Sequence, residues 1–558
     1  MAGYDYIVIG GGSAGCIVAA RLSEDPSAKV LLLEAGPANR GLKVTMPLGV
    51  ALIASKKNPQ NWGFVGEPEP YLDNRQIFCA RGRGLGGSSA INGMLYVRGN
   101  RADYDQWQQM GLRGWGYDDV LPHFKKSENH VDGGDAFHGT GGPLHIDNAD
   151  APNPLNDAIV AAAQEAGFPF TPDFNGAQQE GFGWYDCNIK AGRRGSSAAM
   201  FIEPVKHRSN LTIMTDARIT RIIVKNSRAT SVEFVQGKRQ QVQIAHADRE
   251  IVLSAGVIQS PHILQLSGIG DPARLAVVGI KPVHNLPGVG ANLHDHLDVG
   301  VGNECPKPVT LFSAVGGLKA LSMGLEYLLF KRGVAALPFA QVGGFAKSRP
   351  DLDRPDMQLV VVPAMVADGE FQKKDAFTFH FCQLDPESRG RIDSRSADPF
   401  ADPKILFNYL STEKDRLALR NCVKVARDII SQPAMAIFRG PEILPGDAIR
   451  SDAEIDAWVR QNASTVFHPV GSCRMGVKGD AMAVVDDELR VFGIEGLRIA
   501  DASVMPTVVS GNTNAPAMMI GEKAADMIRC GSAVATKAAR TKIGSRNRIE
   551  GEPGASKE

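Results

Sequence analysis

The stretch STVFHPVGSCRMG, residues 464–476, brings His468, Cys473 and Arg474 together in a segment without an acidic residue. A histidine in such a segment could be a general base, the partner of a cysteine nucleophile, a metal ligand or a packed interior side chain. A reactive thiolate needs an electropositive site. Arg474 is adjacent, but a cysteine among Val, Pro and Gly is more typical of packing.

A metal site is the next alternative for this segment. Zinc in proteins usually has about four ligands, and His468 with Cys473 supplies only two. His294 and His296 in the sequence HDHL are too isolated to complete the set. We therefore predict no metal site and interpret HDHL as a polar structural turn. The general-base and packing interpretations of His468 both remain open at this point.

The N-terminus has the pattern of a dinucleotide site. A β-branched run, YDYIVI, is followed by Gly10, Gly12 and Gly15 and then by a small-residue helix, and KVLLLEAG forms a second strand that ends at Glu34. The glycines permit a tight turn and close approach of the backbone to a pyrophosphate, and the helix N-terminus favours the phosphate charge. Glu34 is placed to bind an adenosine ribose. The motif does not distinguish NAD from FAD.

Two further segments carry candidate binding residues. RGRGLGGSSAINGMLYVRG, residues 81–99, is glycine-rich, but its apolar residues favour burial over a free linker, so we expect a loop whose backbone amides approach a polar ligand. In SGNTNAPAMMIGEKAADMI, Asn514 and Pro516 predict the start of a helix that runs to about Ile528. Capping accounts for Asn514 but leaves Asn512 without a purpose.

Composition excludes several classes of function. The 558 residues include 61 basic and 61 acidic side chains, so the chain has no net charge that would attract nucleic acid or a membrane surface. The eight cysteines contain no C-x-x-C pair, as expected in a reducing compartment. A strand that begins at Tyr4 leaves no room for a signal peptide, and the longest uncharged stretch is interrupted by prolines. We expect a cytoplasmic protein with no transmembrane segment, and leave peripheral contact with the inner membrane open.

The order of strands and helices predicts an α/β protein of two interleaved domains. Residues 1–155, 206–305 and 464–530 form the nucleotide-binding domain, because strand-like runs recur in each of these pieces. Residues 156–205 and 306–463 form a substrate domain. The tail at 531–558 is small, polar and charged, and is predicted to be disordered.

The chain resembles the glucose–methanol–choline (GMC) oxidoreductases, and within them the choline-dehydrogenase-like and alkanol-dehydrogenase-like branch. The resemblance extends to about residue 530 and rests on motifs in the family's order: GGGSAG with Glu34, GRGLGGSSAINGMLYVRG, GVIQSPHILQLSGIG, LPGVGANLHDHL, HPVGSCRMG and DASVMPTVVSGNTNAP. It implies a Rossmann-like FAD-binding domain, a substrate domain built on an antiparallel sheet, and oxidation of an alcohol to an aldehyde.

The resemblance also implies roles for single residues. His468 matches the family's catalytic histidine, and Asn512 lies where members have a second histidine or an asparagine. Members with a covalent histidyl flavin have histidine where this chain has Ala90 and Ile91, so noncovalent FAD is expected. Cofactor contacts are implied for Gly10, Gly12, Ser13, Gly15, Glu34, Ala35, Arg81, Gly86, Gly87, Ser88, Asn92, Gly93, Asp501, Ala502, Asn512 and Thr513.

In the resulting mechanism, neutral His468 takes the hydroxyl proton while hydride moves to flavin N5, and Asn512 stabilises the alcohol oxygen. The helix entrance near Asn514 would stabilise negative charge on the reduced flavin. A hydroxynitrile lyase that uses FAD without net redox change and a non-catalytic flavoprotein are the alternatives. No cation-binding face for choline is identifiable, and the runs FTFHFCQL and LVVVPAMV favour a more apolar alcohol. The electron acceptor is oxygen or a quinone.

Overall fold

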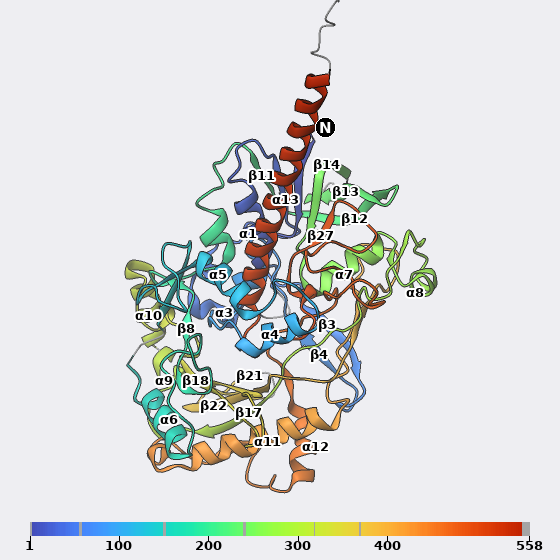
Figure 1. Ribbon diagram of the computed structural model, residues 1–558. Coiled ribbons are helices and arrows are strands. Elements are labelled where there is room, and N and C mark those ends of the chain that lie inside the picture. Colours follow the sequence, from blue (N-terminus) through green and yellow to red (C-terminus); the bar gives the residue numbers. More distant parts are fainter. Residues whose placement is uncertain are drawn as a thin grey trace, which may run out of the picture.

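Two seven-stranded sheets organise the protein. The computed structural model describes residues 3–54, 58–148, 152–237, 241–316, 318–367 and 370–549. Figure 1 shows the first sheet in the upper half of the molecule, beside the N-terminus, and the second in the lower half. The prediction of a nucleotide-binding fold joined to an antiparallel sheet is confirmed.

The first sheet has a parallel core in the order β11-β2-β1-β14-β27. Its central strands are almost continuously apolar and buried, as expected for parallel strands that are covered on both faces. Helix α1 (Ser13–Leu22) follows the first strand and packs against α13 (Asn514–Ile549). The parallel strands are β1 (Tyr4–Ile9), β2 (Val30–Leu33), β11 (Leu211–Met214), β14 (Val242–Leu253) and β27 (Leu497–Ile499).

Strand β14 is long enough to belong to two layers. Its last three residues pair with β27, while its first residues pair with antiparallel β13 (Arg228–Gln236), which pairs in turn with β12 (Ala217–Lys225). The carboxyl ends of β1, β2 and β14 lead directly into Gly10, Glu34 and Ser254, so these three residues lie at one edge of the sheet. Ligands of open parallel sheets bind at that edge.

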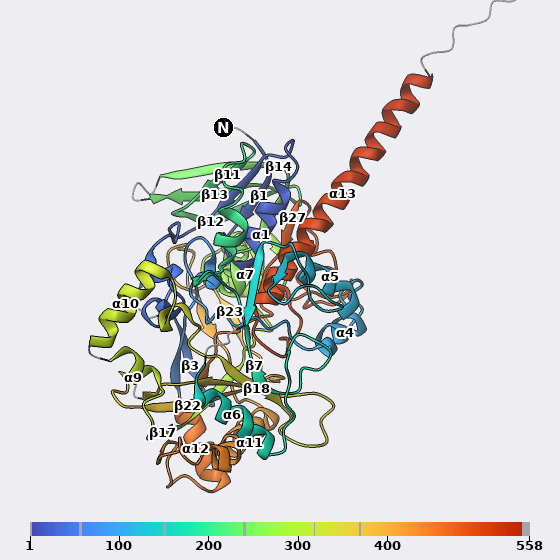
Figure 2. The ribbon, with the colours of Figure 1, turned by 90° about the vertical axis from the view of Figure 1, so that its left-hand side faces the viewer.

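The second sheet is antiparallel throughout and runs in the order β25-β17-β22-β19-β18-β7, with β26 beside β17. One face packs against α6 (Pro154–Glu165) and α11 (Glu413–Ser431), with α12 (Asp452–Asn462) outside α11; Figures 1 and 2 show these helices at the bottom of the molecule. Its strands are β7 (Gly181–Trp184), β17 (Leu297–Glu304), β18 (Val342–Ala346), β19 (Met357–Val362), β22 (Ala376–Gln383), β25 (Glu442–Leu444) and β26 (Ser464–Thr465).

The two faces of this sheet have different roles because side chains alternate along each strand. In β19, Leu359 and Val361 belong to the buried apolar core on the helix-covered side. Their neighbours Gln358, Val360 and Val362 line the central cavity. The second sheet therefore forms one wall of the cavity that the first sheet borders from the other side.

Two features of the fold correct the sequence prediction. Strand β17 is a central strand of the antiparallel sheet, although the predicted boundary at 305 assigned it to the nucleotide-binding domain. Strand β17 follows directly on the nucleotide-binding domain, and its composition does not change at the point where the chain passes into the second sheet.

Helix α13 (Asn514–Ile549) continues past Ile528, where it was predicted to end, so residues 531–549 of the predicted disordered tail are helical. Their Ala, Lys and Arg residues favour helix. Residues 550–558 lie outside the described part.

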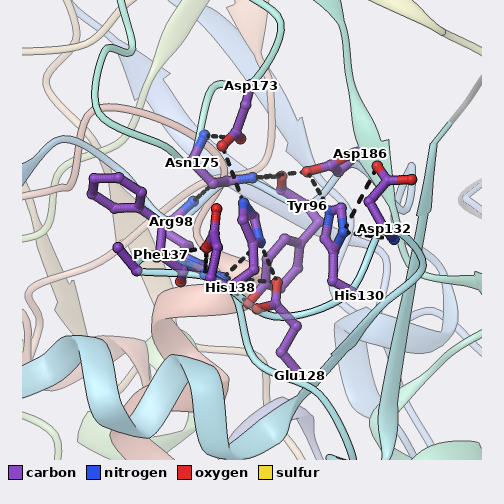
Figure 3. A network of polar contacts seen from close by, with 12 residues as sticks. Tyr96, Arg98, Glu128, His130, Asp132, Phe137, His138, Asp173, Asn175 and Asp186 are labelled. Atoms are coloured by element: carbon purple, nitrogen blue, oxygen red, sulfur yellow. Dashed lines mark hydrogen bonds and ion pairs between the residues drawn. The ribbon is translucent and has the colours of Figure 1, made fainter.

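A buried polar network joins three segments that lie far apart in the sequence (Figure 3). The Arg98 guanidinium donates to Glu128 Oε1 at 2.7 Å, and the two imidazole nitrogens of His138 lie 3.2 Å from Glu128 and 3.0 Å from Asp173. Burial opposes protonation of His138, but its hydrogen bonds to Asp173 and Glu128 outweigh burial and raise its pKa to about 9. His138 is therefore a cation at neutral pH.

We expect this network to make stability pH-dependent. Because the pKa of His138 is about 9 in the folded protein and about 6.5 when unfolded, its contribution is complete below pH about 6.5 and is lost as pH rises through about 9. His138→Gln should lower stability at pH 6.5 by about 3 kcal/mol, because it leaves buried charges incompletely paired.

The measurement is the Tm of the full-length protein at a series of pH values from about 6.5 to about 9.5, which covers the range between the unfolded and folded pKa of His138. The difference between wild type and His138→Gln should shrink as pH rises, whereas exposed His207→Gln should follow wild type throughout. A difference that is the same at every pH would contradict the cationic state of His138.

Candidate active site

Two glycine-rich loops touch each other at the edge of the first sheet. Gly10 has φ +97°, and a Cβ added to Gly15 would lie 1.9 Å from the Gly10 oxygen, so the turn and the helix–strand packing both require glycine. A Cβ on Gly87 would lie 2.7 Å from the Cα of Gly12, and the Gly86 N–H donates to Gly11 O at 2.7 Å. The loop at 81–99 therefore packs directly against the turn that opens α1.

Glu34 is held at the end of β2 by the same loops. Its carboxylate accepts the N–H groups of Gly11, Gly36 and Gly84 at 2.8–2.9 Å. Burial raises its pKa, which the hydrogen bonds from these three glycines counteract. The Glu34 carboxylate lines the cavity, where it can also accept from a bound hydroxyl group.

A cavity of about 540 Å³ lies between the two sheets. It brings together His468, Asn512 and all the predicted cofactor residues except Gly15 and Gly86, which shape the surrounding backbone. The predicted cofactor residues that line it are Gly10, Gly12, Ser13, Glu34, Ala35, Arg81, Gly87, Ser88, Asn92, Gly93, Asp501, Ala502, Asn512 and Thr513.

Asp501 has a structural task at this cavity. Its Oδ2 accepts from the Ser260 hydroxyl at 2.6 Å and from the Gly256 N–H at 2.9 Å, at the start of helix α7 (Gly256–Leu266), and its Oδ1 accepts from Ser503 N–H at 2.8 Å. Both carboxylate oxygens are thus engaged with the protein. Asp501 fixes where α7 begins relative to the following segment, whose Ala502 also lines the cavity.

The side chains of His468 and Asn512 meet inside the cavity. His468 Nε2 lies 3.0 Å from Asn512 Nδ2, and Asn512 Oδ1 accepts from Gln358 Nε2 at 3.0 Å. Gln358 Nε2 also donates to the hydroxyl oxygen of Tyr185, which donates its own proton to Leu359 O at 2.6 Å. This chain of donors fixes the orientation of the Asn512 amide, so its N–H group faces His468.

The tautomer of His468 follows from these contacts. An N–H donor facing Nε2 requires a lone pair there, so the proton of the neutral imidazole is on Nδ1. Nδ1 lies 3.1 Å from Nδ1 of His296, which accepts that proton in a hydrogen bond. Burial, together with His296 and Arg81, lowers the pKa of His468 well below its usual value, and burial lowers that of His296 to about 4. Both rings are therefore neutral at pH 7.

The segment HDHL was predicted to be a structural turn without a role, but besides His296 it contains Asp295, which holds the backbone of His468. Asp295 is buried, and its carboxylate accepts the backbone N–H of His468 at 2.8 Å, the hydroxyl of Tyr409 at 2.7 Å and the hydroxyl of Thr465. His294 Nε2 accepts the N–H of Val508 at 2.9 Å. Sequence spacing carried no signal for these contacts, since HDHL and His468 are more than 170 positions apart.

A second carboxylate was also missed by the sequence analysis. Asp298, on β17, is buried and lines the substrate-sheet side of the cavity, where its Oδ2 lies 2.8 Å from Nδ1 of His380 on β22. The neighbouring lining residues on β19 and β22 are mostly apolar, including Val360, Val362 and Cys382. The acidic group in this wall is thus already paired with a protein side chain.

Cys473 lies outside this arrangement. It is fully buried, and burial together with Asp501 raises its pKa well above the usual value, so the side chain is a thiol and belongs to the core of the nucleotide-binding domain. In the part of the chain that the structure describes, no group of three or more His, Cys, Asp or Glu side chains could hold a metal ion.

At the helix entrance, Asn514 is the first residue of α13 and not its cap, and its Oδ1 accepts from Ser13 at 2.8 Å.

The chain belongs to the GMC oxidoreductase family. Two models of this family match residues 4–298 and 386–521. The family resemblance seen in the motifs is thereby confirmed, and FAD is the cofactor typical of the family. The protein is accordingly a GMC-type FAD oxidoreductase that acts on alcohols, similar to choline dehydrogenases.

Similar proteins extend over nearly the whole chain. Mitochondrial choline dehydrogenase of Mus musculus is 43% identical over 94% of this chain and 89% of its own length. Oxygen-dependent choline dehydrogenase of Vibrio vulnificus is 44% identical over 94% of each chain. Among solved structures, pyridoxine 4-oxidase from Mesorbium loti has a TM-score of 0.85 with 32% identity, covering 94% of this chain and 98% of that one. Formate oxidase has a TM-score of 0.88 with 27% identity, covering 95% and 98%.

Proposed function

We propose that this protein oxidises an uncharged alcohol to an aldehyde, with His468 as the general base and noncovalently bound FAD as the hydride acceptor. The observation that supports it is the unprotonated Nε2 of His468, which lies in the cavity beside the amide of Asn512. A base must be within hydrogen-bond reach of the proton that it takes. His468 meets this requirement for a hydroxyl group bound next to Asn512.

The roles of the two side chains follow from their protonation. Neutral His468 takes the hydroxyl proton at Nε2, and the positive charge that it gains is partly balanced by Asp295, whose carboxylate holds the His468 backbone. The Nε2 atom of His468 has a single lone pair, so the alcohol hydroxyl takes the place of the Asn512 N–H at that atom, and the freed N–H group can donate to the alcohol oxygen as its negative charge develops. One such donor is typically worth about 3 kcal/mol, or about 10²–10³ in rate.

The glycine loops and Glu34 fit a bound FAD. Gly12 and Ser13 at the start of α1 would hold the pyrophosphate, and Glu34 a ribose hydroxyl. Ser254 Oγ and Gln259 Nε2 are buried at the cavity and have no hydrogen-bond partner within the described residues, so both can bond the cofactor. FAD, when bound, supplies the acceptor for the hydride that leaves the alcohol carbon.

An uncharged, largely apolar substrate fits the substrate wall better than a cation. Asp298 is paired with His380, and a cationic alcohol would have to displace that histidine to reach the carboxylate. The face of Trp62, another lining residue, is approached by the guanidinium groups of Arg83 and Arg218, at 5.4 and 5.3 Å from the ring centre, so that these cations take the place of a substrate ammonium group. Among the remaining lining residues of this sheet, Val360, Val362 and Cys382 are apolar, and the others, Gln358, Ser464 and Thr465, are uncharged.

Anaerobic reduction of the enzyme-bound flavin by alcohols tests the proposal. The rate with wild type should rise with pH through a pKa below the usual 6.5 of histidine, because burial, His296 and Arg81 lower the pKa of His468. His468→Ala should bind FAD but lose flavin reduction by several orders of magnitude. Asn512→Ala should lose about 10²–10³. A rate of flavin reduction in His468→Ala close to that of the wild type would show that His468 is not the general base.

The same absorbance assay separates the alternatives. Aliphatic and aryl alcohols should bleach the flavin faster than choline does. A faster reaction with choline would contradict the substrate class but leave alcohol oxidation standing. Consumption of a cyanohydrin while the flavin stays yellow would indicate a lyase, and no change with any compound would indicate a flavoprotein without turnover.

A pair of variants tests His296 as the residue that holds the tautomer of His468. His296→Leu removes the acceptor for His468 Nδ1–H, and an unpaired buried donor costs about 1–3 kcal/mol, or about 5- to 150-fold in the rate of flavin reduction. His296→Gln keeps an acceptor oxygen and should retain most of the rate. Equal rates for Leu and Gln, with intact flavin spectra, would show that His296 only fills space.

The cofactor linkage can be tested by denaturation. Ala90 and Ile91 are buried at the loop where covalent members of the family have histidine, and neither side chain can form a bond to the flavin. Acid precipitation should therefore release all the yellow colour as free FAD into the supernatant, with a mass spectrum of unmodified FAD. Flavin that stays with the precipitated chain would contradict noncovalent binding.

A further inference from the structure

Helix α10 (Leu318–Phe330) exposes four leucines to the solvent. Leu321, Leu325, Leu328 and Leu329 follow the spacing i, i+4, i+7, i+8 and so share one helix face, and they are 50–70% exposed. In a helix that covers a core, this spacing normally marks the buried face. Both views of the molecule show α10 at its outer edge (Figures 1 and 2).

The opposite face of α10 is the one that holds the helix to the protein. Tyr327 is buried in a small apolar cluster against which Met323 packs, and its hydroxyl donates to Thr45 O at 3.4 Å. The helix therefore has a fixed inner face and an outer leucine face, which we call the leucine stripe (Leu321, Leu325, Leu328 and Leu329). Scattered exposed leucines are ordinary, but four on one helix face indicate a binding surface.

Basic side chains gather at the C-terminal end of the stripe. Lys331 and Arg332 follow α10 directly. The β9–β10 hairpin (Ile189–Lys190 and Arg193–Arg194) lies against this end, since a Cβ added to its Gly192 would lie 1.8 Å from Lys331 O. Lys190, Arg193 and Arg332 are exposed. Of these cations, Arg332 is paired with Glu326 at 3.1 Å. The chain as a whole is neutral, so this end carries a local positive excess.

We propose that the leucine stripe docks this protein onto the surface of an anionic lipid bilayer. A helix of 13 residues is about 20 Å long, too short to cross a bilayer core of about 30 Å, and no helix in the described part of the chain is long and apolar enough to do so. A helix with an apolar face and flanking cations lies in the headgroup region, with its apolar side chains inserted and its cations near lipid phosphates.

The position of α10 gives this contact a consequence for the cavity. The chain continues from α10 through η5 (Val334–Ala336) to Phe339, which lines the cavity. The segment that receives Tyr327 at Thr45 continues to Val50, which also lines the cavity. The proposed bilayer surface is thus joined to the cavity wall by two short segments, so apolar molecules dissolved in the lipid would be concentrated beside it.

Vesicle flotation of the flavin-loaded full chain tests the proposal. The vesicles are phosphatidylcholine alone or equal parts of phosphatidylcholine and phosphatidylglycerol, each at low and high salt. The wild type should float with the anionic vesicles and less with the neutral ones, and high salt should weaken the binding. Substituting the four stripe leucines by Gln should lower the bound fraction by about tenfold or more.

A matched variant controls for the loss of four aliphatic side chains. Val242, Val277, Val283 and Ile437, which are 54–86% exposed, lie outside α10, and their replacement by Thr should leave vesicle binding unchanged. Equal flavin content and Tm must show that both variants are folded. Absence of wild-type flotation would overturn the proposal. So would self-association of the wild type that the leucine substitutions abolish without any effect of lipid, because the stripe would then bind a second copy.

Discussion

The active site depends on one constraint, the hydrogen bond between the two neutral imidazoles of His468 and His296. It leaves the lone pair of His468 on Nε2, toward the cavity, where Asn512 lies 3.0 Å away. Neither ring could hold this arrangement alone, because an imidazole can flip and exchange its proton between nitrogens. Asp295 fixes the backbone of His468, and Gln358 fixes the amide of Asn512. The residues that surround the base therefore define its chemical state as well as its position.

These groups come from both domains, because the second sheet supplies most of them and the segment before α13 supplies Asn512. Asp295 and His296 immediately precede β17, Gln358 lies on β19, and His468 follows β26, whereas Asn512 precedes the helix that packs on α1. A chain that passed once from a cofactor domain to a substrate domain would place its base on one side only. Repeated crossing brings residues from four distant segments around the end of the parallel sheet. Because side chains alternate along β19 and β22, the face of these strands that is turned away from the helix-covered core borders the same cavity.

Local patterns in the sequence were sufficient to predict the glycine turn, the first strands and the position of Glu34 at the end of the second strand. They left the role of His468 open and gave none to Asn512, and only the resemblance to the family pointed to both residues, whose side chains the structure brings together in the cavity. They could not predict His296, Asp295 or the pairing of Asp298 with His380, since these contacts join segments tens to more than a hundred positions apart. The boundary at 305 failed for a related reason: β17 has the same apolar alternation whichever sheet it joins. The end of α13 was missed because small and charged residues suit a solvent-exposed helix as well as a tail without structure.

For the leucine stripe, the sequence shows the helical spacing of the apolar residues but does not show which way that face of the helix points. Periodicity alone would assign Leu321, Leu325, Leu328 and Leu329 to the core, and only the buried contact of Tyr327 shows that the helix is anchored by its other face. An apolar face left outside costs solubility, and a chain of zero net charge has little repulsion to offset that cost. The stripe is therefore most easily understood as a surface whose stable environment is apolar, and its short connections to the cavity wall give that environment access to the site where His468 lies.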